Sequence, residues 1–310
     1  MSLMQKIMFS LIKRGQKPYD PSQPHDYAVK RVAEEKGVPQ KLPKGIMSRE
    51  VELDGTDGEY LFSDHNPKDR CILYIHGGGF VTGSTKTVRP LTGELVKQTG
   101  CNLYSIRYRL APEHPFPAAP EDCFRAYCAL AEKYDGEGIA VIGESAGATL
   151  TLATVLRAKD EGIPLPACTV VLAPAVQFDQ EFPSHRENLA TDCMVSNLSE
   201  EVRATYLVTG DPAVLHNPYA APYYGNYKGF PPTLIIASDS EVLRDDSVFL
   251  HQKMKKAGAE SRIHLYPGMM HIFPVAPSLP ESRQALREIG EFVREKQKSH
   301  LQEKTGGADK

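Results

Sequence analysis

A short strand that leads directly into a helix constrains the fold of this chain more than any other feature of its sequence. Residues 139–142 form an apolar run of strand length, and residues 149–157 have the composition of a helix body. Between them lies a G-x-S-x-G sequence, Gly143–Gly147. So tight a turn forces its middle residue, Ser145, into a strained backbone conformation, and the flanking glycines lack the Cβ atoms that would clash there. The pattern predicts that the Ser145 hydroxyl is held out at the top of a sheet, within reach of a substrate and a base.

Strands and helices alternate along most of the chain, which predicts an α/β fold with a mostly parallel sheet and helices on both faces. Residues 49–53 and 59–62, separated by turn residues, predict a β-hairpin. Further strands are expected at residues 70–76, 102–107, 140–142, 169–172, 233–237 and 262–266. Helices are expected at residues 87–98, 119–133, 146–160, 243–257 and 280–296. A chain of 310 residues with 41% hydrophobic content is long and apolar enough to form one large core of this kind.

Residues 173–228 break this alternation, because they contain charged residues, a short helical patch and a Pro/Tyr-rich stretch but no clear strand. So long a connection is usually functional. We interpret it as an insertion over the C-terminal edge of the sheet, which packs with N-terminal helices at residues 3–14 and 25–36 to form a cap. The resulting division is residues 1–45 for the N-terminal cap helices, 176–227 for the cap insertion, 46–175 and 228–297 for the α/β core, and 298–310 for a polar tail. This tail is expected to be disordered beyond residue 298.

The N-terminus carries an apolar stripe at helical spacing within residues 1–12. Lys6 interrupts the stripe, Lys13 and Arg14 follow it, and no small-residue cleavage site comes next. These features favour an amphipathic helix, lying on the body of the protein or on a membrane surface, over a signal peptide. No apolar run is long enough to span a membrane, so no stable membrane insertion is expected.

Composition narrows the range of partners and compartments. The formal net charge of −3 gives no reason to expect a nucleic-acid partner. The six cysteines are scattered, several within apolar runs, which favours reduced thiols in a cytoplasmic protein over a disulfide framework. The sequence contains neither an HExxH motif nor paired CxxC motifs, so no metal site is expected.

A glycine-rich stretch, His76–Phe80, follows the predicted strand at residues 70–76. Acyl transfer needs N–H donors aimed at the oxygen that becomes negative in the tetrahedral intermediate. A loop of this kind can direct two N–H groups inward, and the residue after the nucleophile can supply a third, so we assign these donors to Gly78, Gly79 and Ala146. Phosphate-binding loops have other glycine patterns, which are absent here. We interpret His76 as a structural residue that fixes the loop, although its position also makes it a candidate base.

A serine nucleophile needs a base, and the base needs a carboxylate to orient it. Among the histidines that follow Ser145, His271 lies in a loop between the last predicted strand and the last predicted helix, where it can reach back over the sheet edge. The acid is expected after the strand at residues 233–237, where Asp239 and Glu241 are both candidates. Their positions alone do not distinguish them. Asp245 and Asp246 fit better in the first turn of a helix, where carboxylates offset the helix dipole.

Four motifs occur in a fixed order along the chain: HGGGF at His76–Phe80, YRLAPEHPFPAAPED at Tyr108–Asp122, GESAG at Gly143–Gly147 and EVLRDD at Glu241–Asp246. Together they resemble the hormone-sensitive-lipase-like group of α/β-hydrolases, and the match runs from about Arg70 to the last helix. The resemblance implies an α/β-hydrolase fold with an eight-stranded sheet and a helical cap. It also implies hydrolysis of short-chain acyl esters without a cofactor, and it allows a homodimer.

Carried over residue by residue, the family's machinery comprises a nucleophile, a base and three oxyanion donors: Ser145, His271, and Gly78, Gly79 and Ala146. The family's usual acid lies in an Asp-Pro-Leu-Arg-Asp-Glu motif. Alignment of residues 243–246 with that motif places the acid at Glu241, a glutamate where aspartate is common. This departure leaves Asp239 as the alternative acid.

These expectations describe a serine carboxylesterase that hydrolyses a small-molecule ester through an acyl-enzyme. An amidase, a deacetylase or a lactonase would use the same residues, because these reactions differ only in the leaving group. A non-catalytic small-molecule receptor on the same scaffold is a further alternative. Such proteins tend to lose a member of the triad, and here all three are present in the sequence.

Overall fold

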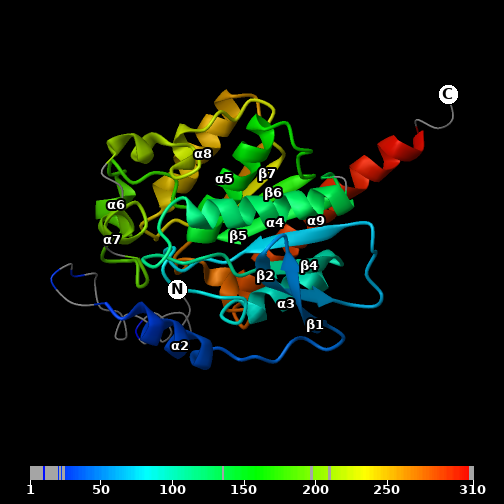
Figure 1. Ribbon diagram of the computed structural model, residues 1–310, viewed down its shortest axis with the longest axis horizontal. Coiled ribbons are helices and arrows are strands. Elements are labelled where there is room, and N and C mark those ends of the chain that lie inside the picture. The colour runs from blue at the N-terminus through cyan, green and yellow to red at the C-terminus, as the bar shows by residue number, and fades with distance from the viewer. Residues whose placement is uncertain are drawn as a thin grey trace.

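An eight-stranded sheet forms the centre of the computed structural model, which describes residues 10, 20, 22, 25–134, 136–195, 198–208 and 211–306 (Figure 1). Its strand order is β1-β2-β4-β3-β5-β6-β7-β8. The strands are β1 Met47–Leu53, β2 Thr56–Phe62, β3 Cys71–Ile75, β4 Asn102–Ile106, β5 Ile139–Glu144, β6 Cys168–Leu172, β7 Thr233–Ser238 and β8 Ser261–Tyr266. β1 and β2 form the predicted hairpin, and β2 pairs antiparallel with β4. The remaining neighbours pair in parallel, which confirms the predicted sheet.

Helices cover both faces of this sheet, as the alternating pattern predicted. They are α3 Arg89–Thr99, α4 Ala118–Tyr134, α5 Ala146–Asp160, α8 Arg244–Lys256 and α9 Pro280–Gly306. Helices α4, α5 and α8 lie on one face, and α3 and α9 lie on the other (Figure 1). Successive side chains of β3 enter different cores: Leu73 packs with the first group of helices and Tyr74 with the second. Because β3 is buried on both faces, its sequence is almost wholly apolar.

The parallel register brings the carboxyl ends of several strands to one edge of the sheet. Ile75, which ends β3, lies level with Gly143 near the end of β5. Ser238, which ends β7, lies level with Tyr266 at the end of β8. The loops that follow β3, β5, β7 and β8 therefore leave the sheet at the same edge, and residues far apart in sequence meet there.

The connection between β6 and β7, called the β6–β7 insertion below (residues 173–232), contains no strand in its described part. Its helices are α6 Ser184–Glu187 and α7 Leu198–Thr205, with 3-10 helices at Pro212–His216 and Pro222–Tyr224. The N-terminal helix α2, Tyr27–Gly37, lies at the same end of the molecule as α6 and α7 (Figure 1). The hydroxyl of Tyr27 donates to Glu201 of α7 over 3.0 Å, which joins the two segments. Their role as a cap stays a prediction.

Two expectations concern the ends of the chain. The helix expected at residues 3–14 lies, apart from Ser10, outside the described residues. The expectation of a disordered tail is wrong as far as residue 306, because α9 continues to Gly306 and projects away from the sheet (Figure 1). Residues 297–305 are mostly good helix formers and include neither glycine nor proline, so nothing in the sequence ends the helix earlier. Among the described residues, no helix combines the length and the apolar character needed to cross a membrane.

Candidate active site

Ser145 occupies the turn between β5 and α5 with the strained backbone that the sequence predicted. Its φ of 54° and ψ of −124° are unusual for a residue with a side chain. The glycines on either side are required by close backbone contacts. A Cβ atom at Gly147 would lie 2.1 Å from the carbonyl oxygen of Ile75, and one at Gly143 would lie 2.4 Å from that of Gly147. The turn is also fixed to β6, because the N–H of Ser145 donates to the carbonyl of Leu172 over 2.8 Å.

Three buried side chains from three loops meet above this turn. The Nε2 atom of His271 lies 2.9 Å from the Oγ of Ser145, and its Nδ1 atom lies 2.5 Å from Oε2 of Glu241. Because a carboxylate only accepts hydrogen bonds, Nδ1 carries the proton and Nε2 is left to accept from the serine hydroxyl. The other carboxylate oxygen of Glu241 accepts from the N–H of Ser238 over 2.6 Å, which fixes its rotamer. The structure therefore brings Ser145, His271 and Glu241 together as a hydrogen-bonded chain.

The alternative acid, Asp239, has a different set of contacts. Its Oδ1 accepts from the N–H of Gly268 over 2.8 Å and from the hydroxyl of Ser240 over 2.6 Å. The hydroxyl of Ser238 also donates to the carbonyl of Met269 over 2.6 Å. These bonds join the loop after β7 to the loop that carries His271. Asp239 thus contributes to loop geometry, while Glu241 contacts the imidazole.

Electrostatics at the imidazole favour its protonated form. Burial is the largest single influence on the pKa of His271, and it lowers this pKa. The hydrogen bond and the charge of Glu241, together with the charges of Asp192 and Glu144, outweigh burial. The pKa of His271 is therefore raised above its ordinary value. The pKa of Glu241 is also raised, in this case by burial itself, although His271 and the N–H of Ser238 oppose this shift. An imidazole with this environment accepts a proton readily and holds it as imidazolium.

The glycine loop after β3 packs directly against the serine. A Cβ atom at Gly77 would lie 3.0 Å from that of Ser145. Gly78 and Gly79 have φ values of 110° and 61°, in the region that favours glycine. In the described part of the chain, the N–H groups of Gly78, Gly79 and Ala146 have no hydrogen-bond acceptor, so they are available to a ligand atom.

His76 has the structural role that the sequence favoured over a role as base. Its Nδ1 lies 2.8 Å from the carbonyl of Gly77, and its ring stacks on Tyr108 with centroids 4.3 Å apart. Burial lowers the pKa of His76 to about 4, although the Gly77 carbonyl opposes this shift. The hydroxyl of Tyr108 donates to the His76 carbonyl over 2.9 Å. The residue therefore fixes the start of the loop as a neutral imidazole.

Glu144, the residue before the serine, is a support that sequence reasoning missed. One of its carboxylate oxygens accepts from the N–H of Gly77 over 2.6 Å, and the other accepts from the hydroxyl of Tyr74 over 2.5 Å. Burial raises the pKa of Glu144 to about 7, partly offset by these two donors. The GESAG motif contained this residue, but nothing in the sequence indicated that it holds the glycine loop.

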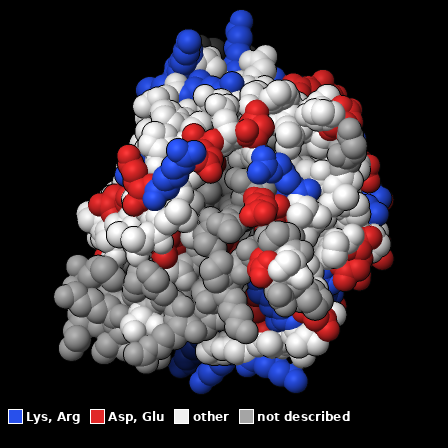
Figure 2. All heavy atoms as spheres, turned by 90° about the vertical axis from the view of Figure 1, so that its left-hand side faces the viewer, with Lys and Arg blue, Asp and Glu red and all other residues white. Residues whose placement is uncertain are grey.

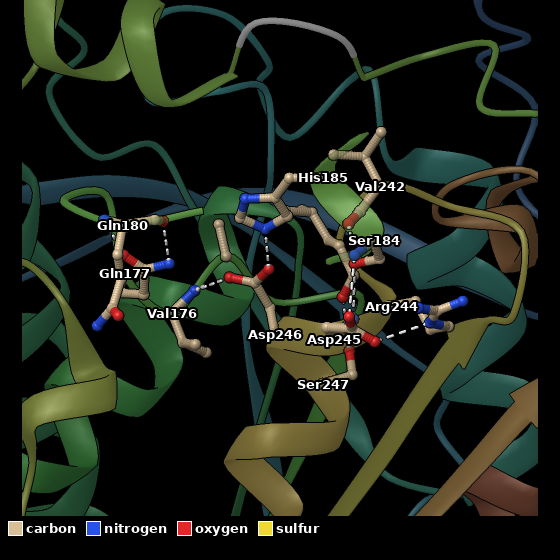
Figure 3. Close-up of polar contacts among 12 residues, drawn as sticks. Val176, Gln177, Gln180, Ser184, His185, Val242, Arg244, Asp245, Asp246 and Ser247 are labelled. Carbon is tan, nitrogen blue, oxygen red and sulfur yellow. Dashed lines mark hydrogen bonds and ion pairs between the residues drawn. The ribbon is translucent and has the colours of Figure 1, made fainter. Parts of the chain in front are cut away.

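Asp245 and Asp246 lie in the first turn of α8, as predicted, and they also bind the β6–β7 insertion (Figure 3). Asp246 accepts from the N–H of Val176 over 2.9 Å and contacts Nε2 of His185 at 2.5 Å. Asp245 accepts from the N–H of Ser184 over 2.9 Å. These contacts fix the start of α6 against α8, close in sequence to Glu241.

The face that carries α2, α6 and α7 has mixed charge. Figure 2 shows acidic and basic side chains interspersed over this end of the molecule rather than separated by sign. Within the described residues, no group of three or more His, Cys, Asp or Glu side chains is arranged to hold a metal ion.

Comparisons with known proteins agree with this architecture. A family model described as alpha/beta hydrolase fold matches residues 72–275. The chain is 36% identical to an acetyl-hydrolase of Streptomyces hygroscopicus over 228 residues, which cover 73% of this chain and 75% of that protein. A solved esterase from the bacterial hormone-sensitive lipase family has a TM-score of 0.87 and 32% identity, with 96% of this chain and 99% of that chain covered. The esterase EstE5, solved after soaking with p-nitrophenyl butyrate, has a TM-score of 0.88 and 33% identity over the same shares of the two chains. The chain therefore belongs to the α/β-hydrolase-fold family, in its hormone-sensitive-lipase-like group, and is a carboxylic ester hydrolase.

Proposed function

We propose that this protein hydrolyses short-chain acyl esters with Ser145 as nucleophile, His271 as general base and Glu241 as the acid that orients the base. The observation that carries the proposal is the continuous hydrogen-bonded chain from Glu241 through His271 to Ser145, at 2.5 and 2.9 Å. The serine is presented by a strained turn, and the base is held in the tautomer that can accept its proton. Such an arrangement activates an alcohol that is otherwise a weak nucleophile near neutral pH.

In the first half of the reaction, the Oγ of Ser145 attacks the ester carbonyl carbon while Nε2 of His271 takes the hydroxyl proton. The carbonyl oxygen becomes negative and accepts from the N–H groups of Gly78, Gly79 and Ala146, which have no acceptor in the described part of the protein. Cleavage of the ester C–O bond then releases the alcohol, which takes the proton back from Nε2. The acyl group stays on Ser145.

In the second half, water takes the place of the alcohol. His271 accepts a proton from the water as its oxygen attacks the acyl carbon, and the same three N–H groups stabilise the second oxyanion. The proton returns to Oγ as the acyl–serine bond breaks and the carboxylic acid leaves. Glu241 stabilises the imidazolium in both halves, which is consistent with its effect on the pKa of His271.

Two similar proteins support the short-chain assignment: one relative is an acetyl-hydrolase, and one solved esterase was soaked with a butyrate ester. We further propose that the β6–β7 insertion and α2 form a cap over the site. In support, the insertion contacts the loop that carries Glu241, and α2 is joined to α7 through Tyr27 and Glu201. On this view the insertion limits the length of acyl chain that the site accepts.

The test has two parts. A fluorophosphonate probe should label Ser145 of the wild-type protein, and Ser145→Ala should lower kcat on p-nitrophenyl acetate and butyrate by about 10⁴-fold or more. Retained turnover by Ser145→Ala would reject the assignment. A series of p-nitrophenyl esters from acetate to decanoate, run beside matched anilides and lactones, should give its highest kcat/KM on acetate or butyrate. A preference for anilides or lactones would replace the esterase assignment, and absence of both labelling and turnover would favour a receptor.

A further inference from the structure

The β6–β7 insertion binds the loop that carries Glu241 through most of the backbone carbonyl and N–H groups of that loop. We define the acid loop as residues 239–242 and the clamp segment as residues 184–192, which begins with α6. Side chains of the clamp segment donate to the carbonyl oxygens of all four acid-loop residues and accept from one of their N–H groups. These contacts span about fifty positions in sequence, so they join two separate parts of the fold at the site.

Asp192 provides the acceptor in this clamp. Its Oδ2 accepts from the N–H of Val242, the residue after Glu241, over 2.8 Å. Its Oδ1 accepts from the N–H groups of Met194 and Val195 over 2.7 and 3.0 Å. The residue as a whole is only 5% exposed. A buried carboxylate with three backbone donors has a fixed position, and it fixes the backbone that it binds.

The other contacts are donors. The side-chain amide of Asn188 donates to the carbonyls of Asp239 and Glu241 over 3.1 and 2.8 Å. The hydroxyl of Thr191 donates to the carbonyl of Ser240 over 2.9 Å. The hydroxyl of Ser184 donates to the carbonyl of Val242 over 2.7 Å. The acid loop contains no regular structure of its own, so these side chains replace the backbone partners that a helix or strand would provide.

The start of the clamp segment is itself anchored on α8. Figure 3 shows Ser184 and His185 facing Asp245 and Asp246, with Val242 beside Ser184. The hydroxyl of Ser184 accepts from the N–H of Asp245 over 3.0 Å while it donates to Val242. The clamp segment is thus fixed at its start by the helix that follows the acid loop, and its far end reaches the loop through Asp192.

We propose that Asp192, Asn188 and Thr191 are positioning residues for the triad. They hold Glu241 at hydrogen-bonding distance from His271 and thereby make the insertion part of the catalytic machinery. This inference rests on the proposed function. The carboxylate of Glu241 is otherwise located by the N–H of Ser238, so a shift of the acid loop would change its distance to the imidazole. Small displacements of this kind reduce catalysis strongly, because the proton transfer depends on alignment.

Asp192 also contributes charge. The charged groups that act on His271 are Glu241 in the acid loop, Asp192 in the insertion and Glu144 at the end of β5, and each raises the pKa of the imidazole. Removal of the Asp192 charge should therefore lower the pKa of His271. A purely structural residue of the insertion would not produce this shift, so the pH profile distinguishes the two roles.

The experiment compares Asp192→Asn with the wild-type protein. Asparagine keeps the bonds to Met194 and Val195 but turns an amide N–H toward the N–H of Val242, which breaks the contact with the acid loop. We expect kcat on p-nitrophenyl butyrate to fall about tenfold to a hundredfold with a smaller change in KM. The acid limb of kcat/KM should move to lower pH, the rate of fluorophosphonate labelling at Ser145 should fall, and the downfield proton resonance of the His271–Glu241 hydrogen bond should shift or broaden.

Two further variants keep the test decisive. Thr191→Val replaces an exposed side chain with a nearly isosteric one and removes one donor, so the variant should fold even if Asp192→Asn does not. It should produce a smaller loss of kcat with the same change in the proton resonance. Asp179→Asn is the matched control, because this carboxylate lies in the same insertion but binds His216 and Tyr224. It should leave kcat, the pH profile and the resonance unchanged.

The outcomes separate this inference from the proposed function. Wild-type labelling together with unchanged kcat, profile and resonance in folded Asp192→Asn would overturn the inference alone. Equal losses in Asp179→Asn would also overturn it, because the effect would then belong to the insertion as a whole. If Asp192→Asn is unfolded, wild-type values in Thr191→Val would overturn the inference. A wild-type protein that the fluorophosphonate does not label would overturn the proposed function and this inference with it.

Discussion

The Nδ1 atom of His271 lies 2.5 Å from Oε2 of Glu241, and both side chains are almost completely buried. Asp239, only two residues earlier, instead binds the N–H of Gly268 and the hydroxyl of Ser240. Glutamate has one more methylene than aspartate, so it can reach the imidazole from a position further along the loop. The two carboxylates therefore have different hydrogen-bond partners even though they share one loop.

This difference predicts the effect of two conservative substitutions. In Glu241→Gln, the amide oxygen would keep the Ser238 N–H, and the amide N–H would then face Nδ1 of His271. The imidazole would be driven into the tautomer with its proton on Nε2, which cannot accept from Ser145, so kcat should fall by about 10²–10⁴-fold. Asp239→Asn retains an acceptor for Gly268 and should change kcat less than about threefold. Steady-state kinetics on p-nitrophenyl butyrate decide the matter, and a larger loss in Asp239→Asn would reverse the assignment.

The pH dependence of activity follows from the environment of His271. In the proposed mechanism only the neutral imidazole accepts the serine proton, so we expect activity to be lost as pH falls through the pKa of His271. Burial alone would lower that pKa, but Glu241, Asp192 and Glu144 raise it above 6.5. The acid limb of kcat/KM should therefore have its midpoint above the ordinary histidine value. A midpoint clearly below 6.5 would show that burial outweighs the carboxylates.

Local patterns in the sequence predicted the parts of this site that depend on local structure. The strand, the turn at Ser145 and the following helix are contiguous, and the glycines there are explained by contacts with Ile75 and with Gly147. The position of His271 after the last strand followed from strand order, because the carboxyl ends of parallel strands share an edge. These features depend only on the spacing of apolar residues along the sequence and on the order of strands and helices in the fold.

The remaining parts depend on contacts between segments far apart in sequence. Asn188 and Asp192 lie in an irregular stretch, so no periodicity shows which way their side chains face. The choice between Asp239 and Glu241 depends on how the loop turns, and that turn is fixed by the β6–β7 insertion. The extension of α9 to Gly306 depends on the helix propensity of residues 297–305, which their polar composition does not indicate.

Because the end of β3 lies close to the turn at Ser145, addition of one methyl group at Gly147 should strongly reduce the stability of the fold. A Cβ atom at Gly147 would lie 2.1 Å from the carbonyl oxygen of Ile75 and 2.4 Å from that of His76, both backbone atoms that cannot rotate away. Gly147→Ala should therefore lower the free energy of unfolding by about 3–5 kcal/mol, or prevent folding. Gly37→Ala is the control, since a Cβ atom there has no neighbour within 4 Å. Urea unfolding followed by circular dichroism measures both; equal stability of the two variants would contradict the packing described.

A final prediction concerns Glu144, whose carboxyl group is buried between Gly77 and Tyr74. Burial raises its pKa from 4.5 in the unfolded chain to about 7 in the folded protein. The folded protein thus keeps a proton that the unfolded chain releases in this interval. Its contribution to stability is fully present below pH 4.5 and is lost as pH rises through 7, with a total on the order of 3 kcal/mol.

Glutamine at position 144 cannot titrate, yet its amide oxygen can accept from Gly77 and its N–H can donate to the Tyr74 hydroxyl oxygen. Glu144→Gln should therefore lose less stability than the wild-type protein between pH 5 and pH 8, because the proton release is absent. Urea unfolding at the two pH values gives this difference directly. Glu132→Gln, an exposed glutamate of α4, should retain the wild-type pH dependence. If Glu144→Gln and the wild-type protein lose the same free energy of unfolding over this interval, the buried carboxyl is not the group that titrates.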